Sequence, residues 1–142
     1  MLSKILVPVD GSDNSFRALE QAIFLAIKIQ EAQITVLYII EDLPSLYIYS
    51  PKTIEKLHAD YKSESAKILE RCKEMANQSG ININTVLEEG DPASKIIGYS
   101  EMKQFDLIII GSRGMGKFKE FIIGSVSNKV LHHAKRSVML VR

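Results

Sequence analysis

The sequence predicts an α/β fold: a single doubly wound parallel sheet of five strands, in the order 3-2-1-4-5, with helices on both faces. Five short apolar segments alternate along the chain with four longer amphipathic segments, which is the pattern of repeated strand–helix–strand units. Most of the apolar segments are nearly continuous in Val, Ile and Leu, as expected for parallel strands that helices cover on both faces. Right-handed crossovers between such strands favour a doubly wound sheet.

The first three elements lie within residues 4–40. Lys4–Val9 is predicted to be a strand, and the Asp-Gly-Ser-Asp-Asn sequence that follows it is a cluster of turn and helix-capping residues. Ser15–Ile29 is predicted to be a helix because its apolar residues recur at helical spacing. Ile34–Ile40 is apolar except for Thr35 and predicts the second strand.

The next two elements are a long helix and an edge strand. Residues 41–50 match no regular pattern. The capping residue Ser50 precedes a predicted helix, Pro51–Gln78, that has proline at its first position and Gly80 just beyond its end. Ile81–Glu88 alternates apolar and polar residues, which is typical of a strand at the edge of a sheet.

The remaining predicted elements are a helix opened by Asp91-Pro92, a strand at Leu107–Ile110, a helix at Ser125–His133 and a strand at Ser137–Val141. In the order 3-2-1-4-5, strands 1 and 4 are neighbours at the topological switch point, where ligands bind outside the carboxyl ends of the strands. The loops that begin at Asp10 and Gly111 are therefore predicted to line one crevice.

Composition limits the classes of function. The 142 residues suit one domain, predicted to cover 1–142, and 18 basic against 17 acidic residues give a net charge of +1. That balance argues against a partner bound by broad neutralisation of nucleic-acid charge. The single cysteine, Cys72, excludes an intrachain disulfide and a cysteine metal cluster. With no secretory signal or membrane-length apolar run, we expect a cytoplasmic protein that binds neither nucleic acid nor membrane.

Residues 111–125 form a glycine-rich segment that two familiar phosphate-binding templates fail to describe. Gly111, Gly116 and Lys117 have the spacing of a P-loop, but Phe118 replaces the Ser or Thr whose hydroxyl binds Mg²⁺. The third glycine of a dinucleotide-binding fingerprint is also missing. We therefore reject both templates.

A third pattern fits this segment fully, Gly111-x2-Gly114-x9-Gly124-Ser125. Gly111 ends a strand and leaves no Cβ between the backbone and a ligand. Gly124 and Ser125 lie at a predicted helix N-terminus, where unpaired N–H groups and the helix dipole attract phosphate. Basic residues in the loop add positive charge nearby. The pattern therefore predicts a phosphate-binding loop.

Beyond this loop, recognisable patterns occur at residues 5–12 (Ile-Leu-Val-Pro-Val-Asp-Gly-Ser), at 90–92 (Gly-Asp-Pro) and at 137–142. With these segments the chain resembles the universal stress protein family over essentially its whole length, and its complete glycine pattern resembles the ATP-binding branch. The resemblance implies the 3-2-1-4-5 sheet of the adenine-nucleotide α-hydrolase-like fold. It also implies a stress-response homodimer whose last strands, at Val138–Val141, pair edge to edge.

The resemblance further implies a site for ATP, bound with Mg²⁺ or Mn²⁺. Asp10 would meet the ribose and is the candidate protein ligand for the metal, while Ile39 would hydrogen-bond adenine through its backbone. Gly111 would approach the ribose and the α-phosphate. The predicted nucleotide-binding residues are Pro8, Val9, Asp10, Ile39, Gly111, Arg113, Gly114, Lys117, Gly124, Ser125 and Val126.

Asp10 also has a purely structural interpretation. It could cap the first helix or close an Asx-turn. Ser12, Asp13 and Asn14 can cap the same helix equally well, which would leave Asp10 available for a ligand.

The three histidines and Cys72 are not predicted to form a reactive site. His132 and His133 are adjacent on the last predicted helix and so point in different directions. We expect them and His58 at the surface or an interface, and Cys72 in the core on the apolar stripe of the long helix.

No catalytic residue is assigned, because the glycine-rich loop holds no glutamine or carboxylate placed to orient a water for hydrolysis. The leading hypothesis is an ATP-binding switch. One alternative is an enzyme, either a slow ATPase or one that cleaves at the α-phosphate, since residues 9–15 faintly resemble the loop of adenine-nucleotide α-hydrolases. The other alternative is a nucleotide-free dimeric interaction protein.

Overall fold

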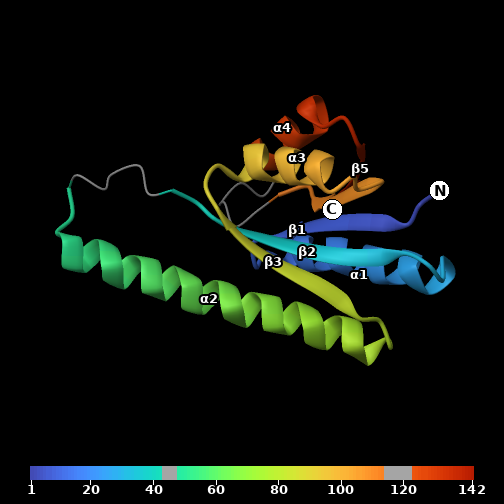
Figure 1. Cartoon of the computed structure of the whole chain (residues 1–142), viewed down its shortest axis with the longest axis horizontal. Helices are drawn as coiled ribbons and strands as arrows, with labels where there is room; N and C mark the ends of the chain where they lie inside the picture. Colours follow the sequence, from blue (N-terminus) through green and yellow to red (C-terminus); the bar gives the residue numbers. More distant parts are fainter. Residues whose placement is uncertain (43–47, 114–122) are drawn as a thin grey trace.

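A computed structural model describes residues 1–42, 48–113 and 123–142. Five parallel strands form one sheet in the order β3-β2-β1-β4-β5, which confirms the predicted fold class and strand order (Figure 1). The elements are β1 (Lys4–Val9), α1 (Asp13–Lys28), β2 (Gln33–Ile40), α2 (Pro51–Gln78), β3 (Ile83–Glu89), α3 (Pro92–Met102), β4 (Leu107–Gly111), α4 (Ser125–His133) and β5 (Ser137–Val141).

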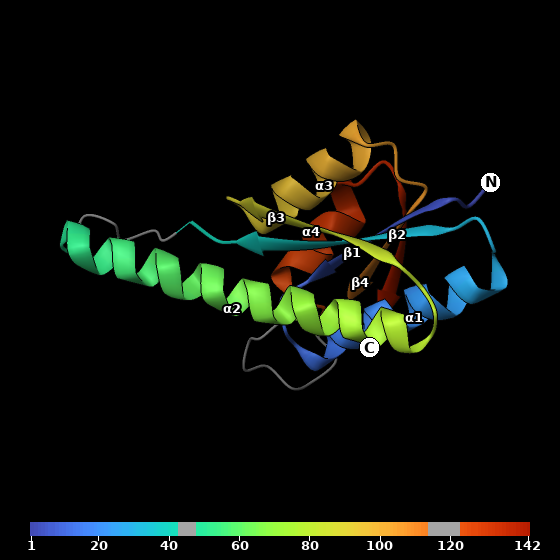
Figure 2. The ribbon, with the colours of Figure 1, turned by 60° about the horizontal axis from the view of Figure 1, so that its bottom comes forward.

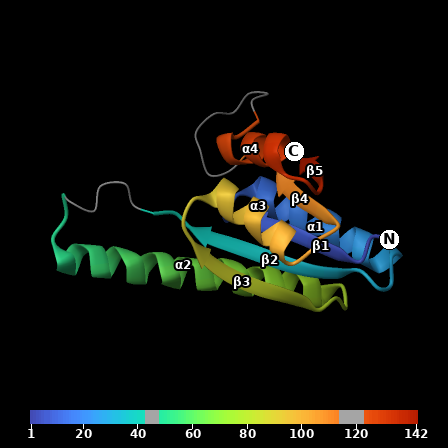
Figure 3. The same ribbon diagram turned by 45° about the horizontal axis from the view of Figure 1, so that its top comes forward.

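Helices cover both faces of the sheet, with α1 and α2 on one face and α3 and α4 on the other (Figures 1 and 3). Alternate residues of β1 supply both cores: Val7 packs with the α1 and α2 side, and Leu6 with the α3 and α4 side. Both side chains are fully buried. This two-sided burial is why the strand segments contain so few polar residues.

Helices α1 and α2 lie side by side on their face of the sheet (Figure 2). The Arg71 guanidinium of α2 lies over the Phe16 ring of α1, 3.9 Å from its centroid, a cation–π contact between the two helices. Cys72 on α2 is fully buried, and burial raises the pKa of its thiol to about 11. Cys72 is therefore a core residue, as predicted, and stays a neutral thiol at neutral pH.

Side-chain caps set the start of three helices. Ser12, Ser50 and Asp91 precede α1, α2 and α3, and each accepts a hydrogen bond from the backbone N–H three residues later. Because Ser12 is the cap, α1 begins at Asp13, two residues before the predicted start. The third strand begins at Ile83 rather than at Ile81, since the Ile81 N–H donates to the Ala76 carbonyl in the turn after α2.

Strand β1 lies between β2 and β4, and its pairing with β4 ends before its pairing with β2. Its register with β2 continues to the pair Val9–Tyr38, whereas its register with β4 comprises only Ile5–Leu107 and Leu6–Ile108. Pro8 has no N–H to donate across this gap. On its other side β4 pairs with β5 along its whole length, from Leu107–Ser137 to Gly111–Val141. Strands β1 and β4 therefore diverge where a doubly wound sheet binds its ligands.

At the amino ends of the strands, Asp106 holds the start of β1 in place. Its Oδ2 accepts hydrogen bonds from the Ser3 N–H, the Ser3 hydroxyl and the Lys4 N–H, at 2.8, 3.0 and 2.9 Å. The backbone bonds from Ser3 and Lys4 hold the pKa of this carboxyl below its ordinary value of 3.8. The ionised carboxylate is therefore favoured in the folded state.

This depressed pKa predicts a pH-dependent contribution to stability. A lowered folded pKa stabilises the protein above pH 3.8, and the contribution is lost as the pH falls through the folded value. Asp106→Asn should lower the free energy of unfolding at pH 7 and flatten its fall between about pH 5 and pH 2. Urea unfolding at a series of pH values measures both effects. A variant with an unchanged acid slope would contradict this role of Asp106.

Candidate functional site

The loops after β1 and β4 meet at the switch point. The Ser12 hydroxyl donates to the Arg113 carbonyl at 3.4 Å, and Asn14 Nδ2 donates to Ser112 Oγ at 3.4 Å. Asn14 Oδ1 also accepts from Arg17 at 2.9 Å. The first two contacts join residues 101 and 98 positions apart and hold the two loops against each other at the carboxyl ends of the strands.

Asp10 lies at this edge, directly after β1, and is exposed. Its Oδ1 accepts the Ser12 N–H at 2.9 Å, which closes an Asx-turn, while Ser12 caps α1. The Asx-turn considered for Asp10 is thus present, together with the cap supplied by Ser12. A carboxylate has two oxygens with about four acceptor positions, so an Asx-turn leaves capacity for a ribose hydroxyl or a cation.

Gly111 is required for a reason that the sequence does not show. A Cβ at Gly111 would lie 2.8 Å from the backbone carbon of Asn14 and 2.9 Å from its oxygen. The missing side chain thus makes room for the first turn of α1, and not only for a ligand as predicted. This contact brings the end of β4 and the start of α1 together at the crevice.

Helix α4 begins without a side-chain cap, unlike the other three helices. Its N-cap residue is Gly124, whose N–H donates to the Ser112 carbonyl at 2.6 Å and so places α4 beside the end of β4. Ser125 and Val126 follow, exposed and half-buried. The first N–H groups of a helix have no intrahelical partner, and with the helix dipole they favour an anion.

The other predicted residues are distributed around this point. Pro8 and Val9 are buried at the end of β1, and Ile39 is half-buried on β2. Arg113 lies against Gly124, with 3.4 Å between its Cα and the position of a Gly124 Cβ. The structure thus gathers Asp10, Gly111, Arg113 and the start of α4, with Ile39 one strand away. Two predicted residues lie outside the described part of the chain, Gly114 and Lys117.

Tyr38 lies on β2 beside the end of β1, and no sequence pattern points to it as a site residue. It pairs with Val9 across β1 and β2 and is half-buried. Burial, followed by the negative charges of Asp10 and Glu64, raises the pKa of its phenol above 10.0. The phenol therefore stays neutral at neutral pH.

The histidines show no metal centre. His58 Nε2 lies 2.9 Å from Glu89 Oε1, and His132 Nδ1 lies 2.8 Å from the Asn128 carbonyl, both at the surface. Across residues 1–42, 48–113 and 123–142, no three His, Cys, Asp or Glu side chains gather into a metal-binding group. In the same ranges, no helix is long and apolar enough to span a membrane.

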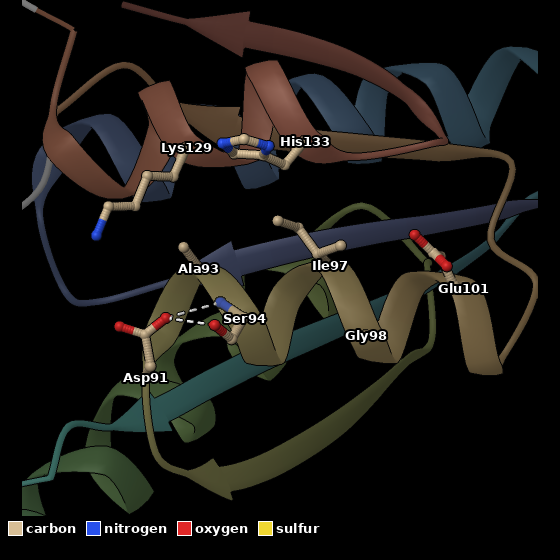
Figure 4. Close-up of a pocket in the computed structure, with 8 residues that line it drawn as sticks. All are labelled: Asp91, Ala93, Ser94, Ile97, Gly98, Glu101, Lys129 and His133. Atoms are coloured by element: carbon tan, nitrogen blue, oxygen red, sulfur yellow. Dashed lines mark hydrogen bonds between the residues drawn. The ribbon is translucent and has the colours of Figure 1, made fainter.

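A separate groove of about 460 Å³ lies between α3 and α4 (Figure 4). Ala93 and Ile97 of α3 point toward α4, whose Lys129 and His133 form the facing side. Of the predicted nucleotide-binding residues that the structure describes, none lines this groove. We therefore place the candidate site at the β1–β4 crevice and not in this groove.

Comparison with known proteins identifies the family. The model of the universal stress protein family matches residues 1–142. The chain belongs to this family. A curated member, universal stress protein YxiE of Bacillus subtilis, is 38% identical over 149 aligned residues that cover 100% of both chains. Universal stress protein MJ0531 of Methanocaldococcus jannaschii is 32% identical, over 100% of this chain and 83% of its own.

Solved members of the family share the fold. Universal stress protein UspA from Lactobacillus plantarum superposes with a TM-score of 0.87 at 27% identity, over 99% of this chain and 98% of its own. Two more distant structures, at TM-scores of 0.74 and 0.71, are a universal stress protein in complex with cAMP and one from Archaeoglobus fulgidus in complex with dAMP. At 21% and 20% identity, these two show likeness of fold alone.

Proposed function

We propose that this universal stress protein belongs to the ATP-binding branch and holds Mg-ATP in the crevice between β1 and β4. The observation that carries the proposal is the start of α4. It lacks a side-chain cap, lies beside the end of β4 and follows a complete glycine pattern. A triphosphate would supply hydrogen-bond acceptors to the first amides of α4, and its negative charge would be favoured by the positive end of the helix dipole. The cAMP and dAMP complexes of other family members support an adenine nucleotide.

The proposed contacts follow the order of the nucleotide. Pro8 and Val9 form the wall beside the base, and the Ile39 backbone hydrogen-bonds adenine. Asp10 meets the ribose with the acceptor capacity that the Asx-turn leaves. The proposed contacts to the α-phosphate and the rest of the phosphate chain are Gly111, Arg113, Gly114, Lys117, Gly124, Ser125 and Val126.

The residues present suit a metal held mainly by phosphate oxygens. Among the described residues no cluster of protein ligands could bind a cation by itself. Mg²⁺ is commonly bound through one or two carboxylates together with substrate phosphates, and Asp10 is the candidate carboxylate. When bound, the cation would screen the negative charge of the phosphates. Mn²⁺ prefers the same oxygen ligands.

We further propose that the protein is a homodimeric switch rather than an enzyme, with two copies paired through β5. This strand lies at one edge of the sheet, and the segment proposed to pair is Val138–Val141. Met139 on this strand is 37% exposed, an apolar side chain that a second copy would cover. Light scattering should give twice the mass of the chain, and the mass of one chain would contradict the pairing.

Equilibrium dialysis against ATP with Mg²⁺, up to millimolar nucleotide, tests the proposed binding. We expect saturable binding of one ATP per chain, and mass spectrometry of the freshly purified protein should show an adenine nucleotide. No binding at millimolar ATP would refute the proposal and favour the nucleotide-free interaction protein. Release of AMP and pyrophosphate in the presence of an acceptor would favour the α-hydrolase type of enzyme instead.

A further inference from the structure

The carbonyl of Ser112 anchors the first turn of α4. It accepts two hydrogen bonds from this turn, one from the Gly124 N–H at 2.6 Å and one from the Ser127 hydroxyl at 3.1 Å. Ser127 is 3% exposed, so its hydroxyl has little access to solvent or to a ligand outside the protein. One carbonyl at the end of β4 thus holds both the first and the fourth residue of the segment that begins α4.

Ser112 is held in place by hydrogen bonds to β5 and α1. Its N–H donates to the Val141 carbonyl of β5 at 2.6 Å, and its hydroxyl accepts from Asn14 of α1 at 3.4 Å. The carbonyl is therefore a fixed reference point in the sheet, and a bond to it sets the position of α4. Side-chain caps usually help to fix a helix start, and α4 has none.

The start of α4 lies within van der Waals reach of the residues that follow β4. A Cβ at Gly124 would lie 3.4 Å from each of three atoms: the Ser112 oxygen, Ser127 Oγ and the Arg113 Cα. The Ser125 and Val126 amides lie between the two residues bonded to the Ser112 carbonyl, so a change in the tilt of α4 would alter the direction of these amides. Hydrogen bonds weaken steeply when their angle falls, so phosphate binding by these amides depends on that tilt.

We propose that Ser127 is a positioning residue for phosphate binding: its hydroxyl ties α4 to the Ser112 carbonyl so that the Ser125 and Val126 amides are aimed at the phosphates. Ser127 itself does not touch the nucleotide. The inference rests on the proposed function, since it requires phosphates at this helix start. It assigns to Ser127 a role that differs from that of the phosphate-contacting Ser125.

Ser127→Ala, compared for ATP and adenosine binding, tests this assignment. The Ser112 carbonyl keeps its bond from Gly124, so the variant should fold with only one hydrogen bond lost. ATP binding should weaken by up to about 10-fold, the free energy of one hydrogen bond, because ATP binding must then fix the position of α4, while adenosine binding changes by less than about twofold. Isothermal titration calorimetry with each ligand gives the ratio of ATP affinity to adenosine affinity. A structural defect would weaken both ligands together.

Ser100→Ala is the matched control. Ser100 is also fully buried on a helix, and its hydroxyl also donates to a backbone carbonyl, that of Ile97, at 2.7 Å. Ser100 lies on α3, away from the start of α4. Loss of its hydroxyl should therefore lower the melting temperature without changing the ratio of ATP affinity to adenosine affinity. If Ser127→Ala does not fold, Ser127→Cys, which keeps a side chain of similar size with a weaker donor, takes its place.

The outcomes distinguish the positioning role of Ser127 from the proposed ATP binding. A selective loss of ATP affinity in the Ser127 variant, absent from Ser100→Ala, supports the positioning role. An equal loss of affinity for ATP and adenosine, or no change in either affinity, overturns that role. The proposed function still stands in that case if the wild-type protein binds ATP. Wild-type protein that binds no ATP overturns both the proposed function and the inference.

Discussion

Gly111→Ala should destabilise the protein by about 2 kcal/mol, as expected for overpacking a well-filled site. The added methyl group would lie 2.8 and 2.9 Å from backbone atoms of Asn14. Backbone cannot rotate aside as a flexible side chain does, so either α1 or the end of β4 must shift. For a chain of this size the melting temperature should fall by about 4–8 °C.

Gly98→Ala gives the matched control, because it adds the same methyl group with the opposite expected sign. Gly98 lies inside α3, and a Cβ there would meet nothing within 4 Å. The substitution should stabilise the protein by about 0.5–1 kcal/mol, the usual preference for alanine over glycine in a helix. Denaturant unfolding of both variants measures the difference. A Gly111→Ala protein as stable as the wild type would contradict the close approach of β4 and α1.

Gly124→Asp should abolish most ATP binding without unfolding the protein. Gly124 has φ −59° and ψ 156°, which any residue can adopt, and Asp is among the preferred N-cap residues. The new carboxylate would cap α4 and compete with phosphate for its first amides. At about 8 Å and an effective dielectric of about 20, one charge repels another by roughly 2 kcal/mol, which is about 30-fold in affinity.

Gly124→Asn separates charge from capping. Asn caps a helix about as well as Asp but carries no charge, so it should reduce ATP affinity much less than Asp does. Both variants should be at least as stable as the wild type, which thermal unfolding checks. Equal ATP binding by the Asp variant and the wild type would place the phosphates elsewhere on the molecule. Equal losses in Asp and Asn would mean that occupied amides, and not charge, cause the effect.

The sequence predicted the fold well because local signals and burial agree. Apolar segments such as Ile34–Ile40 marked the buried strands, and Ser50 and Asp91 cap the helices that they were expected to begin. The third strand was misplaced at its start because the alternation of apolar residues runs on from Ile81. That residue instead hydrogen-bonds Ala76 in the turn that ends α2. The spacing of apolar residues does not show that the Ile81 N–H bonds within the turn and not to a neighbouring strand.

The site was only partly predictable, because the decisive contacts join distant parts of the chain. The glycine pattern placed Gly111 and Gly124 in the loop, but nothing near Gly111 in sequence announces its contact with Asn14. For Asp10 both interpretations apply at once, since Oδ1 closes a turn at the same edge where a ligand is proposed. The bond from Ser127 to Ser112 is likewise invisible without the geometry of α4 and β4.

If ATP phosphates bind at the start of α4, the amide chemical shifts of ¹⁵N-labelled protein will report the contact. Titration with Mg-ATP should shift the Ser125 and Val126 amides most, together with Asp10, because phosphate hydrogen bonds strongly perturb the N–H groups they accept from. Adenosine should shift Asp10 but leave Ser125 and Val126 nearly unchanged. Shifts confined to groove residues such as Ser94 and Ile97, with Ser125 and Val126 unmoved at saturating ATP, would rule out phosphate binding at this helix start.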